Sequence, residues 1–130
     1  MKLEKDLMKQ VKHYLSNRES TGEVIWYGRL NSLKVKTIFG GIVQGCPAGT
    51  PDWIAIVKAK AQYEIKVLFI ECKSSKGLLR TSQKNFIKKY ANKQNIHILV
   101  LREIGDLENW FTIHAYDFVQ DLPSNLAQLC

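Results

Sequence analysis

Cysteine is scarce in this chain, and its arrangement excludes two classes of small protein. The 130 residues include three cysteines, at positions 46, 72 and 130. This odd number lacks the paired spacing of a zinc site or of a disulfide framework. The pattern is typical of a protein in a reducing cytosol.

Long apolar runs are also absent, and none approaches the length of a membrane-spanning helix. The charged start of the chain (Lys2, Glu4, Lys5, Asp6) is not that of a signal peptide. Glycine and proline gather in residues 40–51, but this segment lacks the Gly-Lys-Ser/Thr ending of a phosphate-binding loop. We therefore expect no membrane-spanning segment and no nucleotide cofactor.

Acidic residues are outnumbered, with 12 Asp and Glu against 19 Lys and Arg, a formal net charge of +7 and a pI of about 9.4. This balance favours an anionic partner, with nucleic acid first and an acidic membrane surface second. Hydrophobic residues make up 45% of the sequence. A chain of this length and composition predicts one globular domain over residues 1–130 with its own core.

Hydrophobic periodicity predicts an amphipathic helix over residues 2–17. Strands are expected over residues 24–29 and 33–39, joined by a turn at 30–32, and over 52–59 and 65–73, connected through 60–64. Residues 40–51 are expected to form a mobile loop that lets a ligand approach, because glycine and proline break regular structure. Residues 96–101 are apolar on both faces, which indicates an interior strand.

Two more helices complete the expected order. One is capped by Thr81 or Ser82 and ends near Asn92, and its buried stripe is expected to be Phe86, Ile87, Tyr90 and Ala91. A short one follows over residues 106–111, after a break at Gly105. His97 and His114 have no partners at metal-like spacing and are expected in packing or at the surface. The order predicts an α/β domain with a mixed sheet flanked by helices.

Charged residues end the strand expected over 65–73. Val67 to Ile70 form an apolar run, and Glu71 and Lys73 follow it. Side chains alternate in a strand, so Glu71 and Lys73 project from the same face. Unpaired charges against a core are costly, so a partner is expected there.

Asp52 is the best candidate for this partner, because it opens the preceding strand, one hairpin connection away from Glu71. Two carboxylates at adjoining strand positions offer hard oxygen ligands for Mg²⁺ or Mn²⁺. Lys73 could then hold a water molecule or a developing phosphate charge. Without Glu71 and Lys73, Asp52 would be interpreted as a turn residue at a strand start.

Several other polar residues have two interpretations each. Glu4 falls inside the apolar arc of the first helix, where it serves either the helix dipole or a site beneath the helix. Arg29 and Asn31 are either turn and rim residues or phosphate contacts. Lys34 and Lys36 form one face of their strand, which is either solvated or lies along a nucleic-acid backbone. Lys73, Lys76 and Arg80 lie close together in the sequence, and Gln83 is by itself an ordinary helix residue.

Pro51-Asp52 followed by Glu71-Cys72-Lys73 resembles the signature of the PD-(D/E)xK nucleases. Over residues 3–111 the pattern is similar to the virus-type replication-repair nuclease (VRR-NUC) branch, especially its small stand-alone members. The likeness is carried by Trp26, Arg29, Asn31, the Gly49-Thr50-Pro51-Asp52 turn, Ile70 to Lys73 and Gln83. Order, spacing and strand context together make it fairly specific.

This resemblance implies a restriction-endonuclease-like core of order αβββαβ and Mg²⁺-dependent hydrolysis of DNA phosphodiester bonds, with Mn²⁺ also supporting activity. It implies that Asp52, Glu71 and the main-chain carbonyl of Cys72 bind the metal, and that Glu4 supports it through water. Lys73 would orient or deprotonate the attacking water, and Gln83 would position that water or the scissile phosphate. The DNA-binding residues expected are Arg29, Asn31, Lys34, Lys36, Lys76, Arg80 and Lys84.

Stand-alone relatives resemble Holliday junction resolvases, so branched DNA is the expected substrate and a homodimer the expected assembly, because paired cuts across a symmetric junction need two copies. An exposed apolar patch would serve such a dimer, with Ile38, Phe39, Ile42, Val43, Trp110 and Phe111 as candidates. The alternatives are a monomer that nicks flaps or other single-strand-containing DNA, a catalytically silent nucleic-acid-binding module, and a structural protein with a buried Glu71–Lys73 pair. The expected location is cytoplasmic, in bacteria or in a host cell if the chain is virus-encoded.

Overall fold

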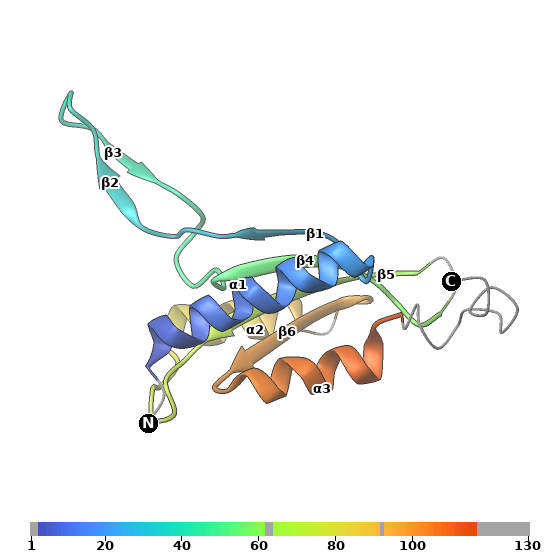
Figure 1. Ribbon diagram of the computed structural model, residues 1–130. Helices are drawn as coiled ribbons and strands as arrows, with labels where there is room; N and C mark the ends of the chain where they lie inside the picture. Colours follow the sequence, from blue (N-terminus) through green and yellow to red (C-terminus); the bar gives the residue numbers. More distant parts are fainter. Residues whose placement is uncertain (1–2, 62–63, 92, 117–130) are drawn as a thin grey trace, which may run out of the picture.

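The computed structural model describes residues 3–61, 64–91 and 93–116. Three helices and six strands are found in this part of the chain (Figure 1). In chain order they are α1 (Glu4–Thr21), β1 (Val24–Arg29), β2 (Lys34–Lys36), β3 (Ile42–Gln44), β4 (Trp53–Lys58), β5 (Ile65–Cys72), α2 (Thr81–Tyr90), β6 (Ile96–Leu101) and α3 (Ile104–His114).

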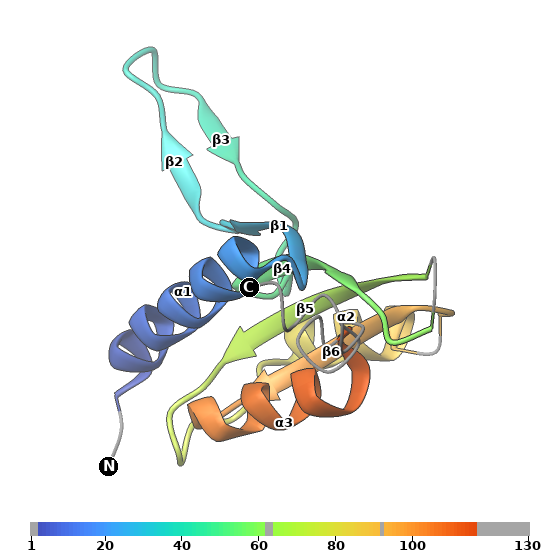
Figure 2. The ribbon, with the colours of Figure 1, turned by 45° about the vertical axis from the view of Figure 1, so that its right-hand side comes forward.

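Four of the strands form one sheet in the order β1-β4-β5-β6. The β1–β4 and β4–β5 pairs are antiparallel, whereas β5 and β6 are parallel. A parallel pair needs a crossover connection, and α2 supplies it between β5 and β6. Helices α1 and α3 contact each other on one face of the sheet, and α2 lies on the opposite face (Figures 1 and 2). The predicted α/β domain with a mixed sheet flanked by helices is confirmed.

The core lies between the sheet and the α1–α3 layer. Alternate residues of the two central strands point into it, as the period of two in a strand requires. On α1, the apolar stripe repeats every fourth residue and meets the same layer. The buried residues on these elements are Leu7, Val11 and Leu15 of α1, Trp53, Ala55 and Val57 of β4, and Leu68, Ile70 and Cys72 of β5. This packing fixes the ends of β4 and β5, where the charged residues lie.

The hairpin formed by β2 and β3 corrects one prediction. Residues 33–39 were expected to form a strand joined to 24–29 by a turn, but residues 34–36 pair with 42–44 instead. These two strands make a separate sheet that projects from the body (Figure 2). The segment 40–51, expected to be a loop throughout, therefore contains β3. Alternation identified the strand at 34–36 but could not identify its partner.

The position of β6 corrects a second prediction, because it is an edge strand of the sheet and not an interior one. Helices α2 and α3 both contact it, one on each face of the sheet. A strand covered on both faces can be apolar on both, wherever it lies in the sheet. The apolar residues on both faces of β6 therefore reflect its packing against the two helices, and they do not indicate a central position in the sheet.

Helix boundaries also differ from the predictions. Helix α1 continues to Thr21 and ends at Gly22, whose positive φ of 98° and N–H bonds to Arg18 and Glu19 are typical of a C-terminal glycine cap. Helix α2 is capped by Arg80 and ends at Tyr90. Helix α3 spans Ile104–His114 and includes Gly105, whereas the helix was expected only over residues 106–111, after a break at Gly105.

Two side-chain predictions are wrong in these helices. Ala91 is exposed, and Phe86, Ile87 and Tyr90 are half-buried, so the only buried side chain of α2 is Gln83. Trp110 and Phe111, expected as candidates for an exposed patch, are buried in the core.

His97 and His114 lie in packing, as predicted. The Trp110 indole N–H donates to His97 Nδ1 over 3.3 Å, and the two histidine rings lie 4.7 Å apart between centroids. Within the described ranges, no helix has the length and apolar character needed to cross a bilayer. Of the predicted segments, residues 2, 62–63, 92 and 117–130 lie outside the described part of the chain.

Candidate metal centre

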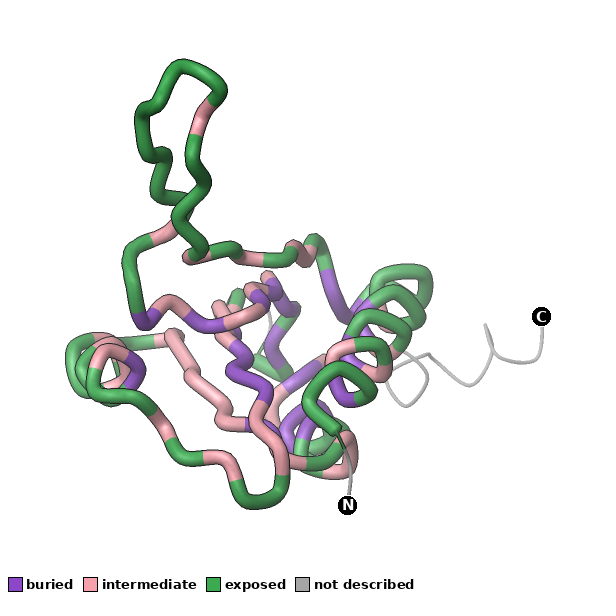
Figure 3. Tube along the Cα trace, turned by 90° about the vertical axis from the view of Figure 1, so that its left-hand side faces the viewer, coloured by how far each residue is buried: buried purple, intermediate pink, exposed green. Residues whose placement is uncertain are grey.

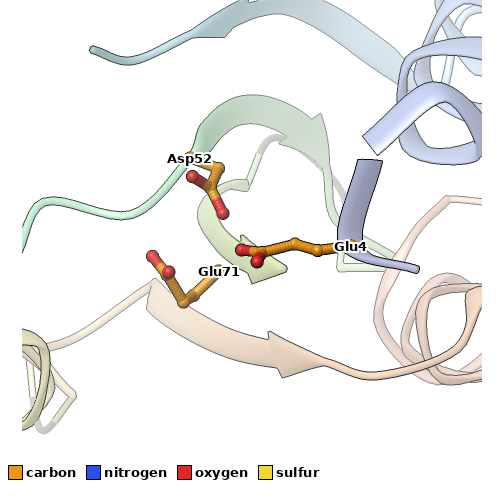
Figure 4. A group of neighbouring side chains, drawn as sticks. All are labelled: Glu4, Asp52 and Glu71. Carbon is orange, nitrogen blue, oxygen red and sulfur yellow. The ribbon is translucent and has the colours of Figure 1, made fainter. Parts of the chain in front are cut away.

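Three carboxylates meet where β4 begins and β5 ends. The register pairs Trp53 with Ile70, so the next residues along, Asp52 and Glu71, lie opposite each other. Glu4 is the first residue of α1, and its side chain reaches across to the other two (Figure 4). One oxygen from each group lies within 4.8 Å of the others. The fold therefore brings together residues that lie 48 and 19 positions apart in the sequence.

The Asp52 carboxylate is held by the backbone of the neighbouring strand. The Cys72 N–H donates to Asp52 Oδ2 over 2.8 Å. In a strand, the N–H and C=O of one residue face the same neighbour, so the Cys72 carbonyl also faces the Asp52 side. This orientation is the one that a main-chain ligand at Cys72 would need.

The turn before Asp52 packs directly on α2. Gly49 has a positive φ of 89°, and a Cβ there would lie 2.2 Å from the Ser82 carbonyl oxygen. Only glycine allows both this backbone conformation and this close approach. The Thr50 N–H and hydroxyl both bond to the Pro47 carbonyl oxygen. The turn thus fixes Asp52 relative to the start of α2.

Glu71 is positioned by a chain of two hydrogen bonds from α2. The Gln83 amide nitrogen donates to Glu71 Oε1 over 2.7 Å, and the Arg80 N–H donates to Gln83 Oε1 over 2.8 Å. Gln83 is 3% exposed and Glu71 is 4% exposed. The Gln83 amide therefore orients a carboxylate, whereas the resemblance implied that it would position the attacking water or the scissile phosphate.

Burial, together with the negative charges of Asp52 and Glu4, raises the pKa of Glu71 to about 7. The cations of Lys73 and Arg80 act in the opposite direction. Repulsion among three carboxylates without a cation makes ionisation of Glu71 costly. A divalent cation would reverse this effect, because its charge favours the ionised form.

Lys73, predicted as catalytic, and the cationic residues predicted for DNA binding differ in how close they lie to this cluster. Lys73 and Arg80 lie close enough to Glu71 to lower its pKa. The Arg29 guanidinium carbon lies 5.7 Å from the centre of the Trp53 ring, which follows Asp52. Lys76 and Lys84 are exposed on the loop after β5 and on α2. Positive charge thus borders the carboxylates on the sides of β1 and α2.

Asn31, Lys34 and Lys36 do not join the cluster, because they belong to the projecting hairpin. Asn31 Oδ1 accepts from the Leu33 N–H over 2.8 Å, and its carbonyl accepts from the Cys46 N–H over 2.6 Å. Asn31 therefore closes the base of the hairpin. Lys34 and Lys36 lie on β2, and both are exposed.

A hollow that the sequence did not indicate lies between α1 and β1, beside the candidate metal centre. Trp53 lines it, and in the described part of the chain its indole nitrogen has no hydrogen-bond partner. The other lining residues are Met8, Lys9, Lys12, Tyr27 and Arg29. The only signal in the sequence was the basic character of the polar side of the first helix. Lys9, Lys12 and Arg29 give the lining of the hollow a positive charge.

The donor set fits a hard divalent cation. It offers carboxylate oxygens and a main-chain carbonyl, the ligands that Mg²⁺, Ca²⁺ and Mn²⁺ prefer. The described residues place no histidine or thiol in the group that could share an ion. These oxygen donors would suit Mg²⁺, Ca²⁺ or Mn²⁺ better than zinc.

Comparisons with known proteins give no relative for this chain. It matches no family model, no curated protein and no solved structure.

Proposed function

We propose that this protein is a Mg²⁺-dependent endodeoxyribonuclease with a restriction-endonuclease-like core. The observation that carries the proposal is the convergence of Glu4, Asp52 and a buried Glu71, with Lys73 two residues further along the same strand face. Like charges this close are costly in a structural protein, so the arrangement favours a bound cation. The net charge of +7 favours nucleic acid as the anionic substrate.

Each residue of the site has its own proposed role in the hydrolysis of the phosphodiester bond. Asp52, Glu71 and the Cys72 carbonyl would hold the ion, with Glu4 supporting it through water. When bound, Mg²⁺ lowers the pKa of water and stabilises charge on the phosphate oxygens. The Lys73 ammonium orients the attacking water and stabilises the charge that develops on the phosphate. Gln83 keeps the Glu71 carboxylate turned toward the cluster through the 2.7 Å hydrogen bond.

Branched DNA remains the preferred substrate class in this proposal, and a homodimer the preferred assembly. Both rest on the resemblance to small stand-alone VRR-NUC proteins. Each chain has one Asp52, Glu71 and Lys73 set. Symmetric cuts in two strands would therefore require two copies related by a twofold axis.

The proposal is tested with a labelled four-way junction, a flap and a linear duplex of the same sequence. We expect cleavage in Mg²⁺ and Mn²⁺, fastest on a branched substrate, and none in EDTA. Ca²⁺ should permit binding with little cleavage, because its looser coordination positions the water poorly. Binding without cleavage in every divalent cation would leave a silent binding module, and equal cleavage in EDTA would exclude a metal mechanism.

A salt titration should locate the DNA surface. The loop after β5 is held by Arg102, whose Nη1 donates to the carbonyls of Ser74 and Gly77, both over 2.7 Å. It presents exposed Lys76 beside Arg80. Reversing both to glutamate should lower affinity and reduce the slope of log K against log salt by about 0.9 for each phosphate that the variant no longer neutralises.

The matched control reverses Lys58 and Lys60, which lie at the opposite end of β4 from Asp52. Fluorescence anisotropy in EDTA measures both variants without cleavage. Equal slopes for wild type and the Lys76–Arg80 variant would place the DNA surface elsewhere.

A further inference from the structure

The hairpin of residues 30–46 projects from the domain and is held rigidly at both ends. At its base, the Gly45 N–H donates to the Leu33 carbonyl over 3.2 Å, in addition to the two Asn31 bonds. At its tip, the Thr37 N–H donates to the Gly41 carbonyl over 2.7 Å, and the Gly41 N–H donates to the Thr37 hydroxyl over 3.0 Å. A segment stabilised this way presents its tip in a defined shape.

The tip carries large apolar side chains in water. Ile38 is 94% exposed and Phe39 is 93% exposed, the two highest values for large apolar residues in the described part of the chain. Figure 3 shows the hairpin exposed along almost all of its length. A monomer rarely leaves adjacent apolar side chains so open unless they meet a partner.

The charge of the hairpin restricts the chemistry of that partner. No acidic residue occurs between Glu23 and Asp52, whereas Arg29, Lys34 and Lys36 all lie in this stretch. Lys34 and Lys36 stand on the stem opposite Gln44 and Ile42. A basic stem below an apolar tip matches DNA, which has phosphates outside and stacked bases inside. A second copy would instead bring the same positive stem against this one.

The hairpin also begins at the metal centre. The Leu30 N–H, directly after β1, donates to the Asp52 carbonyl over 2.8 Å. Arg29 pairs with Trp53 in the sheet. DNA bound at the carboxylates would therefore extend past the base of the hairpin toward its stem.

We propose that the hairpin is a wedge that inserts Ile38 and Phe39 between unstacked bases at a branch point or a frayed end, while Lys34 and Lys36 hold the adjacent phosphates. Apolar wedges of this kind unstack and bend nucleic acids in other proteins. The inference rests on the proposed DNA substrate. It adds that the protein would recognise one structural feature of the DNA, namely weakly stacked bases within reach of the metal centre.

The test uses DNA in EDTA, so that binding is measured without cleavage. A junction and a matched linear duplex carry 2-aminopurine, whose fluorescence rises on unstacking, at the branch point or the equivalent position. Wild type should raise this fluorescence on the junction. The Ile38→Ala/Phe39→Ala variant should lose this rise and bind the junction about tenfold more weakly, the change expected when an aromatic ring that stacks on a base is removed.

The matched control, Ile65→Ala/Ile113→Ala, removes two other exposed apolar side chains, at the start of β5 and on α3. It should behave as wild type. Because all four side chains are exposed, thermal unfolding should hardly change for either variant.

Several outcomes would overturn the wedge. One is an unchanged fluorescence rise in the tip variant. Others are equal decreases in affinity for the junction and the duplex, or a wild-type dimer that becomes a monomer in sedimentation only when the tip is changed, since that result assigns the tip to a second copy. A tip variant that binds and unstacks normally while wild type cleaves in Mg²⁺ would remove the wedge and leave the nuclease proposal intact.

Discussion

Asp52→Asn is expected to lower DNA cleavage by at least about a thousandfold, roughly 4 kcal/mol of transition-state stabilisation. The substitution keeps an oxygen that can accept from the Cys72 N–H, now 2.8 Å from Asp52 Oδ2. The local backbone should therefore be preserved. The substitution removes one of the three negative charges of the cluster, which takes away a charged ligand and weakens the attraction for the cation.

DNA binding should respond in the opposite direction. In EDTA, the carboxylates repel phosphate, and removing one charge should leave the affinity unchanged or raise it. Asp106→Asn, on an exposed aspartate in the first turn of α3, is the matched control and should cleave as wild type. Wild-type cleavage by folded Asp52→Asn protein would defeat the assignment of the metal centre.

Lys73→Met tests the other half of the same site. The Lys73 backbone N–H donates to the Leu101 carbonyl over 2.9 Å, so the end of β5 should keep its conformation when the side-chain ammonium is removed. Cleavage should fall strongly at saturating Mg²⁺, because the metal ligands are intact and the missing charge acts on the water and phosphate. Lys58→Met, at the far end of β4, is the control. Rescue of Lys73→Met by higher Mg²⁺ alone would show a role in metal binding instead.

The central part of the fold could be predicted because its sequence pattern is local. Two apolar runs, one within Trp53–Lys58 and one before Glu71, identify β4 and β5, and their short connection makes them antiparallel neighbours. That pairing places Asp52 beside Glu71. The four-residue repeat Leu7, Val11, Leu15 identifies the face of α1 that meets the core.

The remaining strand pairing and side-chain contacts could not be predicted from the sequence, because they join residues that lie far apart in the chain. The stretch around Lys34–Lys36 alternates like any strand, and only the structure shows that it pairs with Ile42–Gln44. The position of Glu4 in the first helix fits both an interaction with the helix dipole and a place in a site beneath the helix, so the residues alone favoured neither. The contact with Asp52 and Glu71 depends on where α1 packs. The hydrogen bond from Gln83 to Glu71 could not be predicted for the same reason, because the two residues lie 12 positions apart with a loop between them.

Glu71→Gln is expected to stabilise the metal-free protein at pH 8. In the folded protein, burial and the neighbouring carboxylates raise the pKa of Glu71 from an ordinary 4.5 to about 7. The folded state therefore holds this proton more tightly than the unfolded state. Wild-type stability should fall as pH rises from about 4.5 to about 7, by on the order of 3 kcal/mol from this group. Glutamine still accepts the Gln83 hydrogen bond but carries no charge, so this loss should disappear.

Magnesium should act on the two proteins differently. It binds the folded carboxylates and stabilises wild type by mass action, whereas Glu71→Gln lacks a charged ligand and should gain little. Urea unfolding at pH 5 and pH 8, in EDTA and in Mg²⁺, measures four free energies of unfolding for each protein. Glu19→Gln, on the exposed side of α1, should follow wild type in each condition.

The comparison of EDTA with Mg²⁺ is decisive because Glu71→Gln should have opposite effects on the two: it should raise the free energy of unfolding without the metal and reduce the stabilisation by Mg²⁺. In EDTA at pH 8, Glu71→Gln should be the more stable protein, and saturating Mg²⁺ should narrow or reverse the difference. A structural Glu71–Lys73 ion pair predicts the reverse, because removing one partner of a buried pair destabilises at every pH at which both are charged. A less stable Glu71→Gln protein at pH 8, or equal stabilisation of both proteins by Mg²⁺, would therefore identify Glu71 as a structural residue and remove it from the metal centre.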